Sequence, residues 1–155
     1  MKLVAYNSSE TGGMNGVYSL ISVFYNKDGR CKVEIAHRSF HNQPTKYTNY
    51  YAEGLLEKLS EVCERYNVIS WTDLPANNMF LHDAPTINDC FSFENGAKIS
   101  LGSKTQYPLE AFDLFQEIKS LISESESYCV EKEVREEAPA PLAMGMMQFQ
   151  TMEHK

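Results

Sequence analysis

The sequence feature that most constrains the fold is a β-hairpin signal in the second half of the chain. Phe91 and Phe93 alternate with polar residues, the pair Asn95-Gly96 follows, and apolar and polar residues alternate again over residues 97–101. Asn-Gly is the preferred pair for a type I′ turn, which connects two antiparallel strands. The chain is therefore expected to build an antiparallel sheet with one apolar face.

A second hairpin is predicted in the first half of the chain. Residues 17–25 are almost continuously apolar, β-branched or aromatic, which is typical of a central strand. Residues 26–29 (Asn-Lys-Asp-Gly) favour a turn whose glycine supplies a positive φ, and residues 30–37 alternate as the returning strand. An earlier strand is expected over residues 2–6, followed by a Gly-rich loop over residues 7–16.

Two amphipathic helices are expected to cover this sheet. Thr48 or Asn49 can cap the first helix, and Asn67 follows its last turn. The second helix is predicted to begin at Pro108, where a missing N–H costs no hydrogen bond. The apolar stripes have helical spacing and contain Ala52, Leu55, Leu56, Leu59, Val62, Cys63 and Tyr66 in the first helix, and Phe112, Phe115, Ile118, Leu121 and Ile122 in the second.

These elements predict an α+β fold. It is an antiparallel sheet of about five strands with two amphipathic helices packed mainly on one face, in the order β-ββ-α-(β)-ββ-α, plus a C-terminal tail. The bracketed element is the apolar run 68–74, which fits either a brief strand or a buried connector. Residues 76–89 form a long loop, and such loops in compact domains are often functional.

Three local motifs resemble those of known families. They are the Phe-x-Phe-x-Asn-Gly hairpin at residues 91–96, the Tyr107-Pro108 entry into a helix, and the Gly-Gly-Met-x-Gly-x-Tyr loop at residues 12–18. Together they resemble small bacterial α+β families with no assigned function, over residues 1–122. The resemblance implies a fold and no activity, because its motifs are turns and caps.

The chain is expected to divide into three parts. Residues 1–122 form the globular domain, residues 123–141 an acidic and then Ala/Pro-rich linker, and residues 142–155 a Met-rich tail. Of the net charge of −7, residues 123–155 contribute −4. The tail has four apolar residues on one helical face and is either a docking peptide that folds on binding or a disordered segment; these residues are Leu142, Met146, Phe149 and Met152.

Composition excludes several classes of function. No apolar run reaches the roughly 18 residues of a transmembrane helix, and the N-terminus is too briefly apolar for a signal peptide, so we expect a cytoplasmic protein. The sequence has no basic stripe for nucleic acid or anionic membranes. Its four cysteines include no Cys-x-x-Cys, so we predict neither a metal site nor a cofactor.

One group of residues supports an enzymatic alternative. His82 and Asp83 lie in the long loop, a few residues before Cys90. An aspartate can orient a histidine, and the histidine can activate a thiol or a water molecule, which is the chemistry of a small hydrolase. However, Cys90 alternates onto the face opposite Phe91 and Phe93, and no oxyanion-hole motif accompanies it.

Aromatic residues support the first hypothesis, a non-enzymatic binding or protein-interaction module. Tyr47, Tyr50 and Tyr51 cluster at the start of the predicted first helix, and Trp71 is the single tryptophan. Aromatic side chains anchor binding sites because they bury a large area at low entropic cost, although they also fill cores. The expected partner is another protein or a second copy of this chain, contacted through the C-terminal tail.

Overall fold

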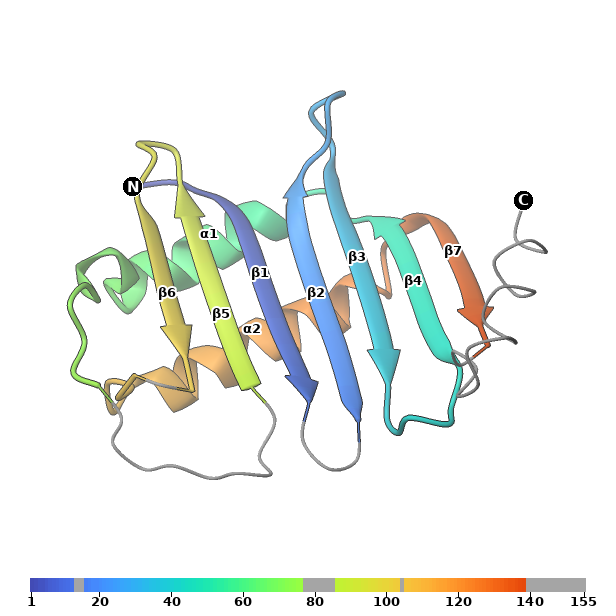
Figure 1. The fold of residues 1–155 in the computed structure, drawn as a ribbon. Helices are drawn as coiled ribbons and strands as arrows, with labels where there is room; N and C mark the ends of the chain where they lie inside the picture. The colour runs from blue at the N-terminus through green and yellow to red at the C-terminus, as the bar shows by residue number, and fades with distance from the viewer. Residues whose placement is uncertain (13–15, 77–85, 104, 139–155) are drawn as a thin grey trace.

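Seven strands form one antiparallel sheet in the computed structural model, which describes residues 1–12, 16–76, 86–103 and 105–138. The strands lie in the order β6-β5-β1-β2-β3-β4-β7 (Figure 1). Their bounds are β1 (Leu3–Gly12), β2 (Val17–Tyr25), β3 (Cys31–Arg38), β4 (Thr45–Tyr51), β5 (Thr86–Phe93), β6 (Lys98–Gly102) and β7 (Val130–Glu137).

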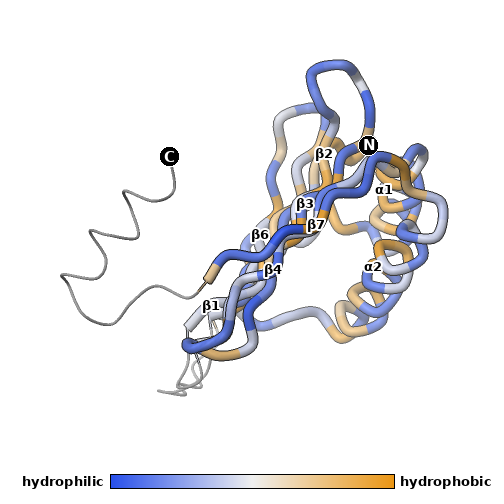
Figure 2. The backbone as a smooth tube through the Cα atoms, turned by 90° about the vertical axis from the view of Figure 1, so that its right-hand side faces the viewer, coloured by the Kyte–Doolittle hydropathy of each residue, from blue (hydrophilic) through white to orange (hydrophobic). Residues whose placement is uncertain are grey.

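Two helices, α1 (Leu55–Arg65) and α2 (Ala111–Ser125), lie on the same face of the sheet. Figure 2 shows the sheet with both helices on one side of it. A short 3-10 helix, η1 (Val68–Ser70), occupies the run for which a strand or a connector was expected. Neither α1 nor α2 is long and apolar enough to cross a membrane.

The α+β class is confirmed, but the sheet is larger than predicted. It contains seven strands rather than about five, because two segments that were assigned otherwise join it. One is β4, placed where the first helix was expected to begin, and the other is β7, placed within the expected linker. In addition, β1 continues to Gly12, through residues expected to form a loop.

The prediction that Thr48 or Asn49 caps the first helix is wrong, because both residues lie in β4. Aromatic and β-branched residues favour a strand, and Tyr50 pairs with Val33 of β3. The helix begins only after Gly54, whose φ of 84° is in the region that glycine adopts without strain. It ends at Arg65, close to the predicted stop.

Strand β7 corrects the expectation of a linker over residues 123–141. It pairs with β4 in antiparallel register, with Val134 opposite Thr48 and Arg135 opposite Tyr47. Every residue of β7 is exposed, so the strand shows no apolar alternation from which a sequence pattern could have identified it. Its contribution to the sheet is backbone hydrogen bonding along the edge of β4.

Both predicted hairpins are confirmed, although the turn at Asn95-Gly96 is not of type I′. Gly96 has a φ of 88° and donates to the Phe93 carbonyl at 2.9 Å, but Asn95 has no positive φ. A type I′ turn requires positive φ at both central residues, so this is instead a three-residue loop with glycine in the left-handed position. The first hairpin repeats it, with Gly29 (φ 85°) donating to the Asn26 carbonyl at 2.9 Å.

The core lies between the sheet and the two helices. The Leu3 N–H donates to the Ser60 hydroxyl at 2.9 Å, which fixes the start of β1 against α1. Phe112 was expected in the apolar stripe of α2, but it is 69% exposed. The buried face of α2 begins at Ala111 and continues through Leu114 and Ile118, and Phe112 lies outside this face. The largest fully buried side chains are Tyr50, Phe91, Leu3, Leu55, Leu56, Leu59, Leu101, Leu114, Ile118, Val23, Val33 and Val68.

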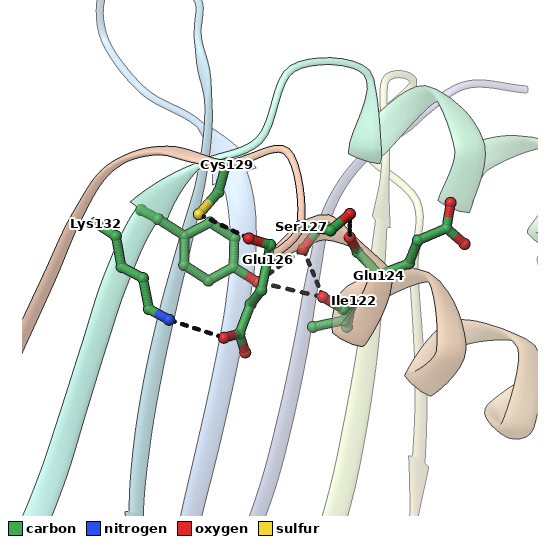
Figure 3. A network of polar contacts seen from close by, with 8 residues as sticks. Ile122, Glu124, Glu126, Ser127, Cys129 and Lys132 are labelled. Atoms are coloured by element: carbon green, nitrogen blue, oxygen red, sulfur yellow. Dashed lines mark hydrogen bonds and ion pairs between the residues drawn. The ribbon is translucent and has the colours of Figure 1, made fainter.

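A buried hydrogen-bond network ties β4 to the end of α2. The Tyr50 hydroxyl lies 2.7 Å from the Ser125 hydroxyl and donates to the Ile122 carbonyl at 3.3 Å. Figure 3 shows the polar contacts around this helix end, including the ion pair of 3.0 Å between Lys132 of β7 and Glu126. The network fixes the position of the C-terminal end of α2 above the sheet. It also gives the buried Tyr50 hydroxyl hydrogen-bond partners in place of water.

We predict that Tyr50→Phe lowers the free energy of unfolding by about 1 kcal/mol, since it removes one buried hydroxyl and its bonds. Ser125 keeps its bond to the Ile122 carbonyl, so no second group is left unpaired. Urea denaturation measures the change. Tyr25→Phe is the matched control, because the hydroxyl of Tyr25 bonds Glu57 in an exposed position, and it should change stability by less than about 0.5 kcal/mol.

Candidate functional site

The sheet face opposite α1 and α2, which we call the open face, is the candidate site. Val23, Val33 and Tyr50 are buried and lie opposite one another across β2, β3 and β4, which places them on the helix-covered face. Successive strand residues point to opposite faces. Their neighbours Phe24 and Tyr51 therefore lie on the open face.

The register joins side chains of the open face into two rows, each of which combines apolar or aromatic residues with one cation. The first row contains Phe24, Lys32 and Tyr51 from β2, β3 and β4. The second contains Leu20, Ala36, Tyr47 and Arg135, and extends onto β7. We call these two sets the aromatic rows. Between them lies a polar row of Ser22, Glu34, Asn49 and Glu133.

The second aromatic row is well packed even though neither α1 nor α2 covers it. Ala36 is only 4% exposed. Its neighbours in the row, Leu20 and Tyr47, are half-buried and lie on either side of it. Larger side chains thus shield the small one, and they leave a continuous apolar strip across the width of three strands.

A cation lies over each tyrosine ring of the open face. The guanidinium of Arg135 lies 4.0 Å from the Tyr47 ring centre, and that of Arg30 lies 3.6 Å from the Tyr51 ring centre. Arg38 lies 5.8 Å from the ring of Tyr18. Each such contact is a cation–π interaction that restricts the ring beneath it. The rings of Tyr18, Tyr47 and Tyr51 are therefore restrained by cations of the same chain.

The other half of the open face, on β1 and β5, carries small polar side chains. Cys90 belongs to it, as its alternation with Phe91 and Phe93 predicted, and it accepts a weak hydrogen bond from the Ser100 hydroxyl at 3.7 Å. His82 and Asp83, its partners in the hydrolase alternative, lie outside the described residues. That alternative stays a prediction.

The predicted aromatic cluster divides between the two faces. Tyr47 and Tyr51 are half-buried on the open face, where a partner can reach them. Tyr50 and Trp71, which were predicted as binding residues, are 1% and 7% exposed in the core, which is the core-filling role that the sequence also allows. Leu142, Met146, Phe149 and Met152 lie outside the described residues.

Sequence reasoning missed Tyr18, Leu20 and Phe24 as surface residues. They alternate with Val17, Ser19, Ile21 and Val23 in a run that was interpreted as one buried central strand. A signal was present, because a strand that is apolar on both faces needs cover on both faces. The helices α1 and α2 lie on one side of the sheet and cover only one face of such a strand.

Buried thiols are unsuited to nucleophilic chemistry here. Burial raises the pKa of Cys63 to about 12 and that of Cys31 to about 11, so both thiols stay protonated and weakly reactive at neutral pH. Within the described part of the chain, no group of three or more His, Cys, Asp or Glu side chains is arranged to hold a metal ion.

One buried carboxyl lies on the helix-covered face. Asp89 is 5% exposed, and its Oδ1 accepts a hydrogen bond from the Tyr6 hydroxyl at 2.9 Å. Burial raises the pKa of Asp89 above its ordinary value of 3.8, while hydrogen bonds from Ser8 and Tyr6 and the charge of Lys119 oppose that rise. Burial likewise raises the pKa of Tyr6 well above 10. The pair is a buried polar contact within the core.

Asp89 gives the folded protein a defined pH dependence. The unfolded carboxyl ionises near its ordinary pKa, whereas the folded carboxyl holds its proton to higher pH, so the folded state binds more protons between the two values. Its contribution to stability therefore falls as the pH rises through that interval. The substitution Asp89→Asn keeps an oxygen acceptor for the Tyr6 hydroxyl. We predict that it removes this fall in stability with pH and that the variant is at least as stable as the parent at neutral pH.

Urea denaturation between about pH 4 and pH 7 checks this prediction. Asp113→Asn is the matched control, since Asp113 is exposed on α2 and its substitution should leave the slope unchanged. If Asp89→Asn instead removes a rise in stability with pH and is less stable than the parent at pH 7, then the carboxyl is charged and stabilising in the fold, and the argument is wrong.

Comparison of the chain with protein-family models, curated proteins and solved structures found no match. The resemblance to small bacterial α+β families therefore stays a prediction, and the functional argument has to come from the site itself.

Proposed function

We propose that the protein is a non-enzymatic binding module and that its open face binds another protein. The observation that carries this proposal is the pair of aromatic rows on a sheet whose helices both lie on the opposite face. Apolar surface that stays in water is unfavourable by about 25 cal/mol per Å², so covering these rows with a partner is favourable.

The chemistry of the open face favours a protein over other partners. Tyrosine, phenylalanine and arginine are the residues enriched in protein interfaces, and Tyr47 with Arg135 is one such pair. The three cations Lys32, Arg38 and Arg135 are matched by three carboxylates, namely Glu34 and Glu133 in the adjoining row and Glu137, which forms an ion pair with Arg135. A face of mixed charge suits neither a nucleic-acid backbone nor an anionic membrane, both of which require a surplus of cations.

The centre of the proposed interface is the second aromatic row. Leu20 and Tyr47 flank the covered Ala36, and Arg135 holds the Tyr47 ring from the edge. Residues that carry most of the binding energy tend to be preorganised aromatic or arginine side chains near the middle of an interface. A contribution of the C-terminal tail to partner binding stays a prediction.

We predict that the double variant Leu20→Ser/Tyr47→Ser loses its partner while remaining folded. The parent and the variant are each used as bait in an extract of the source cells, and retained proteins are quantified by mass spectrometry. A protein retained by the parent should fall at least about tenfold with the variant, because two central contacts worth about 2 kcal/mol or more are removed.

The matched control is Leu109→Ser/Phe112→Ser, which also removes two exposed apolar side chains, 97% and 69% exposed, but beside the helices. It should retain the same protein as the parent. If the control loses that protein and the Leu20/Tyr47 variant keeps it, the binding surface lies at the start of α2, and the proposal fails.

A further inference from the structure

Strand β7 forms one edge of the sheet. It is the last strand in the order, pairs with β4 on its inner side, and has exposed residues throughout. An edge strand presents a row of backbone N–H and C=O groups to which another strand can pair. The side chains of β7 determine which strand that can be.

The charges of β7 are complementary to those of a second copy running antiparallel. With Val134 placed opposite Val134 of the second copy, Lys132 lies opposite Glu136 and Glu133 lies opposite Arg135. The two-fold symmetry repeats both pairs, so four opposite-charge pairs surround one contact between valines. Val134 is 53% exposed and gains cover from this contact. Opposite charges across a strand pair are stabilising.

The order of charges along β7 favours this register over the two registers that are shifted by one residue. A shift by one residue in one direction places Lys132 opposite Arg135, and a shift in the other direction places Glu133 opposite Glu136. Like charges directly opposite each other are destabilising. An edge that is merely protected by charge needs no such self-complementarity.

The two remaining acidic residues of β7 already have cationic partners within the chain. Glu131 has a φ of 54° at a bulge in the pairing with β4 and forms an ion pair with Arg30. Glu137 forms an ion pair with Arg135 at 2.8 Å, and Lys132 forms one with Glu126 at 3.0 Å. Each cation of β7 would therefore lie between a carboxylate of its own chain and one of the second copy. Because the bulge displaces Glu131 from the regular strand, residues 132–136 form the segment available for pairing.

We propose that two copies of this chain pair through their β7 edges in the register centred on Val134. The dimer has one continuous sheet. Residues directly opposite in an antiparallel pair share a face, so the two open faces lie on the same side. Two linked binding faces strengthen attachment to a partner that carries two sites or is itself a dimer. This assembly goes beyond the proposed function and does not depend on it.

Charge exchange on the full-length chain tests the proposal. Lys132→Glu places a second carboxylate opposite Glu136, and Glu136→Lys places a second ammonium group opposite Lys132, so each variant alone should dimerise about tenfold more weakly than the parent. Mixing the two variants, one of them uniformly labelled with ¹⁵N, should restore a dimer of intermediate mass in native mass spectrometry. The double variant K132E/E136K should also restore it.

Lys98→Glu is the matched control, because it makes the same charge change on β6 at the opposite edge of the sheet. It should dimerise like the parent. Thermal melting by circular dichroism checks that each variant is folded, and restoration in the mixture excludes misfolding as the cause of any loss. A monomeric parent, or a dimer that Lys132→Glu leaves intact, overturns the proposal, as does a dimer abolished by Lys98→Glu.

A cross-link tests the register independently. Val134→Cys, made in a chain in which the half-exposed Cys90 and Cys129 are replaced by serine, should oxidise to a covalent dimer, because directly opposite residues lie within disulfide distance. The single substitution Glu133→Cys in the same background should cross-link poorly, since residue 133 lies opposite residue 135. Equal cross-linking of the two variants contradicts the register.

Discussion

One-sided cover of a wide sheet is the constraint on which the rest of this structure depends. Seven strands spaced about 4.8 Å apart span roughly 30 Å, whereas helices of 11 and 15 residues are only about 16 and 22 Å long. Both helices are needed to close the core on one face (Figure 2). The core therefore forms on that side. The second face has to be apolar enough for strands to form and polar enough to stay in water without cover from α1 or α2.

The open face meets this requirement by mixing aromatic rows with charge. Cations over Tyr47 and Tyr51 and a polar row through Glu34 keep the surface wettable, while Leu20 and Phe24 keep it able to bind. The same constraint acts on the edge of the sheet. Strand β7 pairs with β4 and carries charge on both faces, so the edge is soluble but selective for a strand of complementary charge.

Local patterns predicted the elements whose signals are local. The two hairpins, the stripe of the first helix and the position of Cys90 opposite Phe91 follow from spacing and turn residues, whereas the stripe of the second helix was predicted only in part. Strands β4 and β7 could not be predicted in this way. Residues 45–51 alternate as a strand but also offer caps for a helix, and β7 has no buried face at all. Strand β4 forms by pairing with β3 on one side and β7 on the other, and β7 forms only by its long-range pairing with β4.

The candidate site was predicted in part for the same reason. Tyr47 and Tyr51 were identified as an aromatic cluster, but Tyr50 between them points into the core, since successive strand residues face opposite ways. A helix at this point would have grouped all three. The buried carboxyl of Asp89 was missed because its position in a strand under the helices follows from tertiary packing and not from local sequence.

The most direct test of the account is site-specific photo-crosslinking in the source cells. A photoreactive amino acid replaces Ser22, at the centre of the open face, or Ser120, exposed on α2 beside the helix-covered side. The account predicts a discrete cross-linked protein from position 22 and none from position 120. Cross-links from position 120 alone, or none from either position, would contradict the claim that the open face is the binding surface.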